Sequence, residues 1–164
     1  MKIGHFGCGT TILPYADNYD KYPCDDCVQY LDMDQLPYPI KSDTYDKTIC
    51  RHVLEHLNSH PYDVMMELHR ITKPGGEVVV ELPIFGNLVS HRRHLHSRNY
   101  MNPICRRKTM KDMSYIRNSF HLVRQKKCNR RPLLKVLWKI KTRMVTWIDS
   151  FWYDGYEWIL EVRK

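Results

Sequence analysis

A glycine-rich turn and a following acidic side chain near the start of the chain could together bind a nucleotide. Gly7 and Gly9 lie in GHFGCGTT (residues 4–11), and Asp20 ends the next short β-prone run. Glycine lets the backbone approach a ligand without a Cβ in the way. In nucleotide-binding α/β sheets the ligand lies beyond the carboxyl ends of the strands, where an acid accepts hydrogen bonds from ribose hydroxyls. For the two glycines alone, an ordinary tight turn is the alternative.

The spacing of these residues differs from that of NAD-binding sheets. That fingerprint has a third glycine and an acid about twenty residues further on. Here Thr10 and Thr11 follow the glycines, and Asp20 comes only eleven residues after Gly9. The connection after the first strand is also near the minimum for a parallel crossover. We therefore expect the usual first helix to be shortened to a turn, or lost.

Strand-like and helical runs alternate in the first half of the chain, as in an open α/β sheet. EVVVELP (77–83) has the continuous valine run of a buried parallel strand. Apolar residues share one helical face over 61–71, which opens with Pro61 and is stopped by KPGG (73–76). Further strands are expected at 2–6, 16–20, 27–31, 48–50, 119–123 and 156–162, and a second helix at 132–148. We predict one doubly wound domain over residues 1–164.

The composition is that of a globular protein. The 164 residues are 43% hydrophobic and 27% charged, which is enough to bury a core without disulfides. No apolar run reaches the roughly 18 residues that span a membrane, and no export signal is evident. The six cysteines are scattered, so we expect reduced thiols in a cytoplasmic protein.

Charge divides the chain into two halves. Residues 1–90 contain seven Lys/Arg and thirteen Asp/Glu, whereas residues 91–164 contain nineteen Lys/Arg and five Asp/Glu. This asymmetry suggests an anionic partner for the second half, and a solvated basic surface is the alternative. The candidates for contact with an anionic substrate lie in SHRRHLHSR and are His91, Arg92, Arg93 and His94.

Three other kinds of ligand have weaker signals. Zinc could bind histidines of SHRRHLHSR with Cys24 and Cys27, but a single CxxC without a second pair is weak support, so we predict no metal. The basic and aromatic segment 106–131 could contact nucleic acid, although no RNA-binding signature appears. The helix at 132–148 is amphipathic and could lie on an anionic membrane, or it could cover the sheet.

The order of motifs resembles a known family. FGCGTT, LPYADNYDKYP, LDMDQLPYPIKSDTYDKTICRHVLEHL and ELHRITKPGGEVVVELP follow one another over about residues 2–83. In this order they resemble the class I S-adenosylmethionine-dependent methyltransferases, and most closely a compact branch of the type 11 methyltransferase-domain group. The resemblance implies a Rossmann-like sheet, and YEWILEVRK suits the family's last antiparallel strand. Residues 1–83 would then form the cofactor-binding half, and residues 84–164 the basic acceptor-side half.

The resemblance also implies roles for particular positions. The turn at 7–9 would line the methionine end of the cofactor, Asp20 would hold the ribose, 32–34 would flank the adenine, and 51–52 would face the transferable methyl region. The EH pair, Glu55 and His56, is read as mainly structural. The implied cofactor-binding residues are Phe6, Gly7, Cys8, Gly9, Asp20, Asp32, Met33, Asp34, Arg51 and His52.

We therefore predict S-adenosylmethionine-dependent methyl transfer to an anionic acceptor, either a small molecule or a phosphate-bearing one. His52 is the candidate general base, with a packing histidine as the alternative. Because a shortened first helix removes part of the usual cofactor wall, a non-catalytic binding or scaffold protein with the same fold is one alternative. A nucleic-acid methyltransferase is the other.

Overall fold

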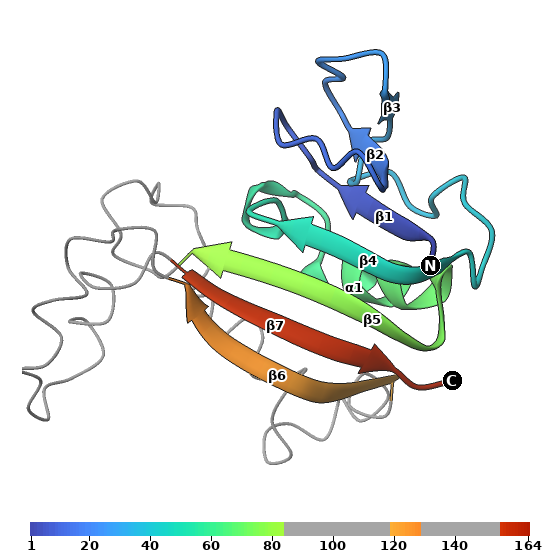
Figure 1. The fold of residues 1–164 in the computed structure, drawn as a ribbon, viewed down its shortest axis with the longest axis vertical. Helices are drawn as coiled ribbons and strands as arrows, with labels where there is room; N and C mark the ends of the chain where they lie inside the picture. Colours follow the sequence, from blue (N-terminus) through green and yellow to red (C-terminus); the bar gives the residue numbers. More distant parts are fainter. Residues whose placement is uncertain (84–118, 129–154) are drawn as a thin grey trace, which may run out of the picture.

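A seven-stranded sheet forms the body of the chain (Figure 1). The computed structural model describes residues 1–83, 119–128 and 155–164. The strands lie in the order β3-β2-β1-β4-β5-β7-β6. Their bounds are β1 Ile3–Phe6, β2 Asp17–Asp20, β3 Val28–Tyr30, β4 Tyr45–Arg51, β5 Thr72–Pro83, β6 Phe120–Cys128 and β7 Gly155–Val162. The predicted α/β fold is confirmed, and so is each of the seven predicted strands.

Strand direction follows the expected mixed pattern. The β1 strand pairs in parallel with β2 and β4, and the parallel pairing continues from β2 to β3 and from β4 to β5. The β7 strand lies antiparallel between β5 and β6. The chain therefore builds the sheet outward from β1 in one direction and then from β4 in the other. Ligands of such sheets bind where the order reverses, at the carboxyl ends of these strands.

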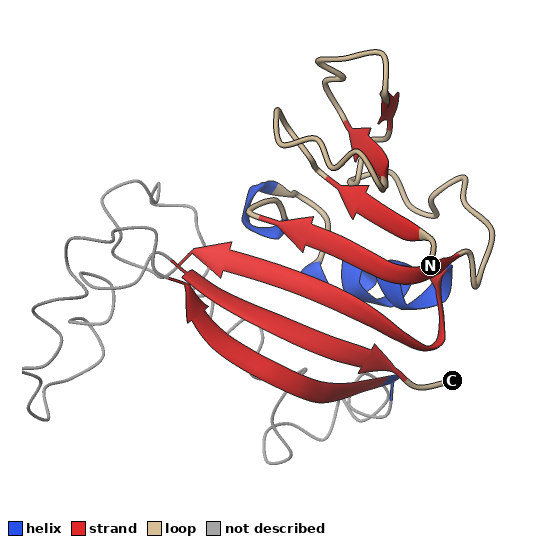
Figure 2. Cartoon of the chain, in the orientation of Figure 1, coloured by secondary structure: helices blue, strands red, loops and turns tan. Residues whose placement is uncertain are grey.

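One face of the sheet is covered by the helix α1 (Pro61–Ile71), which lies behind β4 and β5 in Figure 2. Proline at its first turn has a φ suited to a helix start. Val64, Met65, Leu68 and Ile71 are completely buried, as the predicted helical face requires, and belong to one apolar cluster with strand residues such as Val78 and Trp158. Truncating one of these large side chains to alanine would cost about 2–5 kcal/mol.

The connection from β1 to β2 contains no helix, which confirms the predicted loss. The side chain of Asn18 makes several hydrogen bonds to this connection. The Asn18 amide donates to the carbonyls of Leu13 and Ala16, both at 2.9 Å, and its oxygen accepts the Leu13 N–H at 3.0 Å. These bonds satisfy backbone groups that a helix would otherwise pair with each other.

Three strands are clearly longer than the sequence predicts. The β4 strand covers Tyr45–Arg51 and so extends the predicted strand at 48–50 in both directions. The β5 strand begins at Thr72, directly after α1, so KPGG is part of the strand and not a separate stop. The β6 strand continues past residue 123 to Cys128 through mostly polar residues. An edge strand needs an apolar face only on its core side, and exposed charges there discourage pairing with other chains. The helix predicted at 132–148 lies outside the described residues.

Candidate functional site

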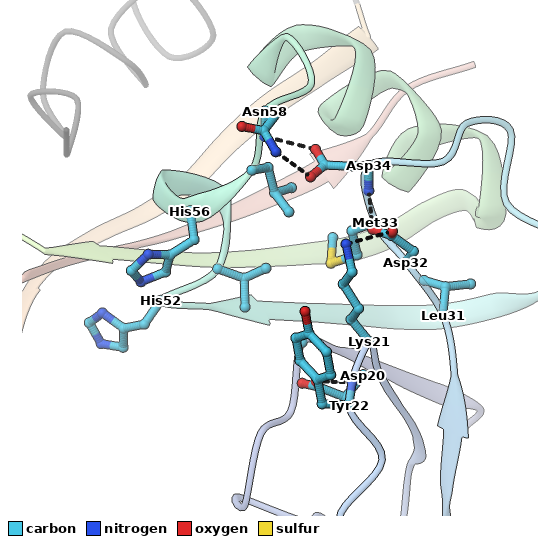
Figure 3. A pocket seen from close by; sticks show the side chains of 13 residues that line it. Asp20, Lys21, Tyr22, Leu31, Asp32, Met33, Asp34, His52, His56 and Asn58 are labelled. Atoms are coloured by element: carbon cyan, nitrogen blue, oxygen red, sulfur yellow. Dashed lines mark hydrogen bonds and ion pairs between the residues drawn. The ribbon is translucent and has the colours of Figure 1, made fainter.

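A hollow of about 410 Å³ lies where the carboxyl ends of β1, β2 and β4 meet the segment that follows β3 (Figure 3). It is lined by Gly7, residues 20–22 and 31–34, and residues 52–53 and 56–58. These positions come from four separate stretches of sequence that only the sheet order brings together. The hollow is therefore at the edge where an open α/β sheet binds ligands.

Gly7 lies in the wall of the hollow, where the side chain of Val53 occupies the space that a Cβ at position 7 would need. Its φ is 66°, and a Cβ built there would lie 2.1 Å from Cγ2 of Val53. Gly9 also has a positive φ, of 52°, but a Cβ there would meet no atom within 4 Å. The glycine at position 7 is thus required by close packing, and the one at position 9 by backbone conformation.

Asp20 is held by the turn that the glycines make. One of its carboxylate oxygens accepts the Gly9 N–H at 2.8 Å, and the other accepts the Tyr22 N–H at 2.9 Å. Each carboxylate oxygen has a second acceptor position. Asp20 can therefore be fixed by the backbone and still accept hydrogen bonds from a ligand in the hollow.

Two further acids follow β3, and both have partners. The Asp32 carboxylate lies 2.8 Å from Nζ of Lys21, which reaches toward it in Figure 3, and it also accepts the Asp34 N–H at 3.0 Å. The Lys21 ammonium, together with that N–H, lowers the pKa of Asp32. The Asp34 carboxylate accepts the backbone N–H groups of Asn58 and Ser59, both at 2.8 Å. Asp34 thus joins the segment after β3 to the segment that leads into α1.

Apolar side chains complete the hollow. Leu31 and Met33 are each 4% exposed, and Val53 and Leu57 pack against the same core. Tyr22 stands at the rim and is 77% exposed. The hollow therefore combines hydrogen-bond acceptors with an apolar floor, as sites for small molecules commonly do.

Other predicted cofactor residues lie beside the hollow and do not line it. Phe6 is fully buried and stacks on Tyr19 with ring centroids 5.1 Å apart. Cys8 is buried too, and burial raises the pKa of its thiol to about 11. The Gly9 backbone and Arg51 also stand outside the lining. The hollow therefore brings together Gly7, Asp20, Asp32, Met33, Asp34 and His52 of the predicted set.

A row of charges crosses the sheet next to the hollow. The strand register places Arg51, Glu81 and Glu157 side by side on β4, β5 and β7. The Arg51 guanidinium lies 3.6 Å from Glu81 and 3.3 Å from Glu157. The two carboxylates therefore share one cation.

His52 follows this row and has an unusual backbone. Its φ is 54°, in the left-handed region that residues other than glycine rarely adopt. Its N–H donates to the Glu81 carbonyl at 2.9 Å, and its Nε2 lies 2.9 Å from the Glu81 carboxylate. Its Nδ1 lies 3.7 Å from the carboxylate of Glu55, in the short 3₁₀ helix η1 (Leu54–His56). The carboxylates of Glu55 and Glu81 raise the pKa of His52 to about 9.

Sequence reasoning missed several lining residues. The lining residues that were not predicted are Lys21, Tyr22, Leu31, Val53, His56, Leu57 and Asn58. Widening each motif by two positions would have found the first four, but not the three residues at 56–58. The pairing of His52 with Glu81 had no such signal, because it depends on the register of β4 with β5.

The predicted substrate-binding residues lie outside the described residues, whereas the two cysteines considered as zinc ligands lie within them. His91, Arg92, Arg93 and His94 all lie there, so their role stays a prediction. Cys24 and Cys27 are exposed thiols, and the Cys24 thiol donates to the Gly9 carbonyl at 3.2 Å. Within residues 1–83, 119–128 and 155–164, no group of three or more His, Cys, Asp or Glu could hold a metal ion. In the same ranges no helix has the length and apolar character to cross a membrane.

Comparison with known proteins agrees with this geometry. Residues 6–80 match the family model of a methyltransferase domain. The match covers the strands and segments that line the hollow. Residues 6–80 thus carry the sequence pattern of a methyltransferase domain. No curated protein matches the chain.

Several solved structures share the fold of this chain at low sequence identity. One comes from the complex between the Haloferax volcanii Trm112 methyltransferase activator and the putative methyltransferase, with a TM-score of 0.64 and 14% identity over 99% of this chain and 82% of that one. The YcgJ protein from Bacillus subtilis has a TM-score of 0.59 and 12% identity over 99% and 92%. A putative S-adenosylmethionine-dependent methyltransferase from Listeria monocytogenes has a TM-score of 0.56 and 14% identity over 99% of this chain and 90% of that one.

Proposed function

We propose that this chain transfers a methyl group from S-adenosylmethionine to an anionic acceptor. The observation that carries the proposal is the hollow itself, with the backbone-held Asp20 at the end of β2 and the buried Met33 after β3. The acid can accept from ribose hydroxyls, and the apolar floor can receive the adenine. Gly7 supports the fit, because a side chain there would collide with Val53 and displace the wall.

In this proposal the protein's work is mainly to bind and align. S-adenosylmethionine supplies a methyl group that its positive sulfur already makes electrophilic. Asp20 would hold the ribose, the segment 31–34 would surround the adenine, and the turn at Gly7 would admit the methionine end. The acceptor would approach from the side of His52, where the strand ends of β4 and β5 meet. Holding two reactants in line supplies most of the rate enhancement that such a displacement needs.

A labelled-methyl assay tests the activity. Purified chain is incubated with S-adenosylmethionine labelled in its methyl group and with fractionated cell extract, and label in a new product is measured. We expect labelled product that is lost in the Asp20→Ala variant. A folded chain that labels nothing in any fraction would contradict the enzymatic proposal.

The acceptor's charge is proposed from the sequence split between an acidic first half and a basic second half. Exposed Arg124 and Lys126 on β6 belong to the basic half. Neutralising Arg92 and Arg93 together should raise the acceptor's apparent KM and leave cofactor affinity unchanged. Acceptor turnover should also weaken with salt, since exposed charges are screened beyond about 10 Å at 0.1 M. If neither the double substitution nor added salt changes acceptor turnover, Arg92 and Arg93 are solvated surface residues that do not bind the acceptor.

A non-catalytic binding role is the second candidate. The observation that favours it is the connection from β1 to β2, where Asn18 replaces a helix and leaves less wall around a cofactor. If the chain binds a partner without chemistry, S-adenosylmethionine will not bind. We also propose a cytoplasmic location, because Cys8, Cys24, Cys27 and Cys50 are free thiols.

A further inference from the structure

His52 is clamped between two carboxylates at the edge of the hollow. Its Nε2 lies 2.9 Å from Oε1 of Glu81, and its Nδ1 lies 3.7 Å from Oε1 of Glu55. The side chains of Glu55 and Glu81 are only 4% and 8% exposed, whereas that of His52 is 28% exposed. Two nearly buried acids thus meet one histidine that faces the pocket.

The geometry decides which form of the ring is stable. A neutral imidazole has one N–H and one lone pair, while an imidazolium donates from both nitrogens. Here either nitrogen, if left as a lone pair, would face a carboxylate oxygen. Buried carboxylates are also costly unless a cation compensates them. Both effects favour the protonated ring.

The surrounding charges do not cancel this preference. Arg51 on β4 lies beside Glu81, but it is shared with Glu157 on β7. His56 in η1 lies 3.9 Å from Glu55 and is itself about half exposed. Lys126 of β6 lies opposite Glu157 in the strand register, so the three glutamates are balanced by Arg51, Lys126 and His52 only when His52 is charged. The direction agrees with the raised pKa of His52.

The backbone holds His52 in the same place. Its left-handed φ of 54° is fixed by the bond from its N–H to the Glu81 carbonyl. A strained backbone persists only where its surroundings determine it, and such positions gather at functional sites. Glu81 therefore binds both the main chain and the ring of His52, while Glu55 binds the ring from the opposite side.

We infer that His52 is a fixed imidazolium that accepts no proton during the reaction. Glu55 is the positioning residue that, together with Glu81, keeps the ring charged. The site then takes an acceptor whose nucleophilic atom is already deprotonated. The part about the acceptor rests on the proposed methyl transfer. The acceptor's lone pair forms the bond to the methyl carbon, and the carbon–sulfur bond breaks with its electron pair going to sulfur. The nucleophilic atom of the acceptor loses one negative charge in this step, the sulfonium becomes a neutral thioether, and no proton moves. This replaces the general-base role predicted for His52 from the sequence.

The direct test is an NMR titration of the histidine rings in the full chain without any ligand. His52 is assigned with the His52→Asn variant, because asparagine tolerates a left-handed backbone. We expect both His52 nitrogens to carry protons at pH 7.5 and the ring to titrate near pH 9. A His52 that is neutral at pH 7.5 in the wild-type chain overturns the inference, and this result needs no other variant.

Matched variants test the part played by Glu55. Glu55→Gln removes one charge next to the ring, and Glu157→Gln makes the same change beside Arg51 only. We expect Glu55→Gln to lower the proton affinity of His52 by about tenfold or more, one pKa unit. Glu157→Gln should change it much less. Equal effects of the two variants would remove Glu55 from this role.

To test the acceptor class, the rate of labelled-methyl transfer to the acceptor found in extract is measured as a function of pH. The rise of rate with pH should reflect the acceptor's own ionisation and lie at the same pH in wild type and Glu55→Gln. A rise that follows the His52 titration and moves with Glu55→Gln would show a general base and contradict the inference. If the methyltransferase proposal is wrong, the chain will not bind S-adenosylmethionine. The NMR titration of His52 needs no cofactor, so its result is independent of that outcome.

Discussion

Val53 occupies the space that a side chain at position 7 would need, with Cγ2 only 2.1 Å from the place of its Cβ. The two residues are far apart in sequence and come from different strand ends, after β1 and after β4. Their contact fixes how closely the two ends approach at the wall of the hollow. The glycine turn therefore sets the distance between β1 and the segment that follows β4.

Gly7→Ala is expected to destabilise the chain by about 1–3 kcal/mol, because overpacking adds to the strain of a left-handed backbone. Val53→Ala in the same chain should return part of that loss by removing the colliding methyl groups. Urea unfolding of both single variants and the double variant measures the coupling. Strictly additive effects would mean that the two side chains do not compete for space.

Asp34 is expected to matter for stability more than for the cofactor. Its carboxylate accepts the N–H groups of Asn58 and Ser59, so Asp34→Ala leaves both donors without their charged partner. Hydrogen bonds to charged groups contribute about 1.5–3 kcal/mol, and the loss should be of that order. Urea unfolding measures it, with the exposed Asp26→Ala as control. An Asp34→Ala variant as stable as the parent would show that the two segments are joined by other contacts.

Stability should depend on pH through His52. Its folded-state pKa, about 9, lies above the ordinary 6.5, so its contribution is fully present below pH 6.5 and is lost as pH rises through about 9. A shift of this size corresponds to a contribution on the order of 3 kcal/mol. The free energy of unfolding of wild type relative to His52→Asn should therefore decrease between pH 7 and 9.5. A difference that stays constant over this range would mean that His52 has the same pKa in the folded and unfolded chain.

The sequence predicts the parts of this molecule that depend on local pattern. Seven strands, the buried face of α1 and the missing first helix all follow from short-range periodicity and spacing. Asp20 and Met33 reach the hollow because Asp20 ends β2 and Met33 lies shortly after β3, at strand ends that must share one edge.

What the sequence could not show depends on register and packing between distant segments. Glu81 meets His52 only because residue 81 lies opposite Arg51 in the pairing of β5 with β4. Lys21 meets Asp32, and Val53 meets Gly7, through contacts between different strand ends. The extra length of β5 and β6 arises from backbone pairing with neighbouring strands, which does not require an apolar pattern.

The central claim is that the hollow binds S-adenosylmethionine through Asp20, and calorimetric titration of the full chain tests it most directly. The titration compares wild type with Asp20→Asn, which keeps the shape but removes the charge and one of the two acceptor oxygens, and with Asp26→Asn as an exposed control from the loop after β2. Loss of a charge-assisted bond of about 1.5–3 kcal/mol predicts affinity at least about tenfold weaker for Asp20→Asn. Asp26→Asn should bind like wild type. A folded wild-type chain that binds no S-adenosylmethionine, or an Asp20→Asn variant of unchanged affinity, would contradict the account.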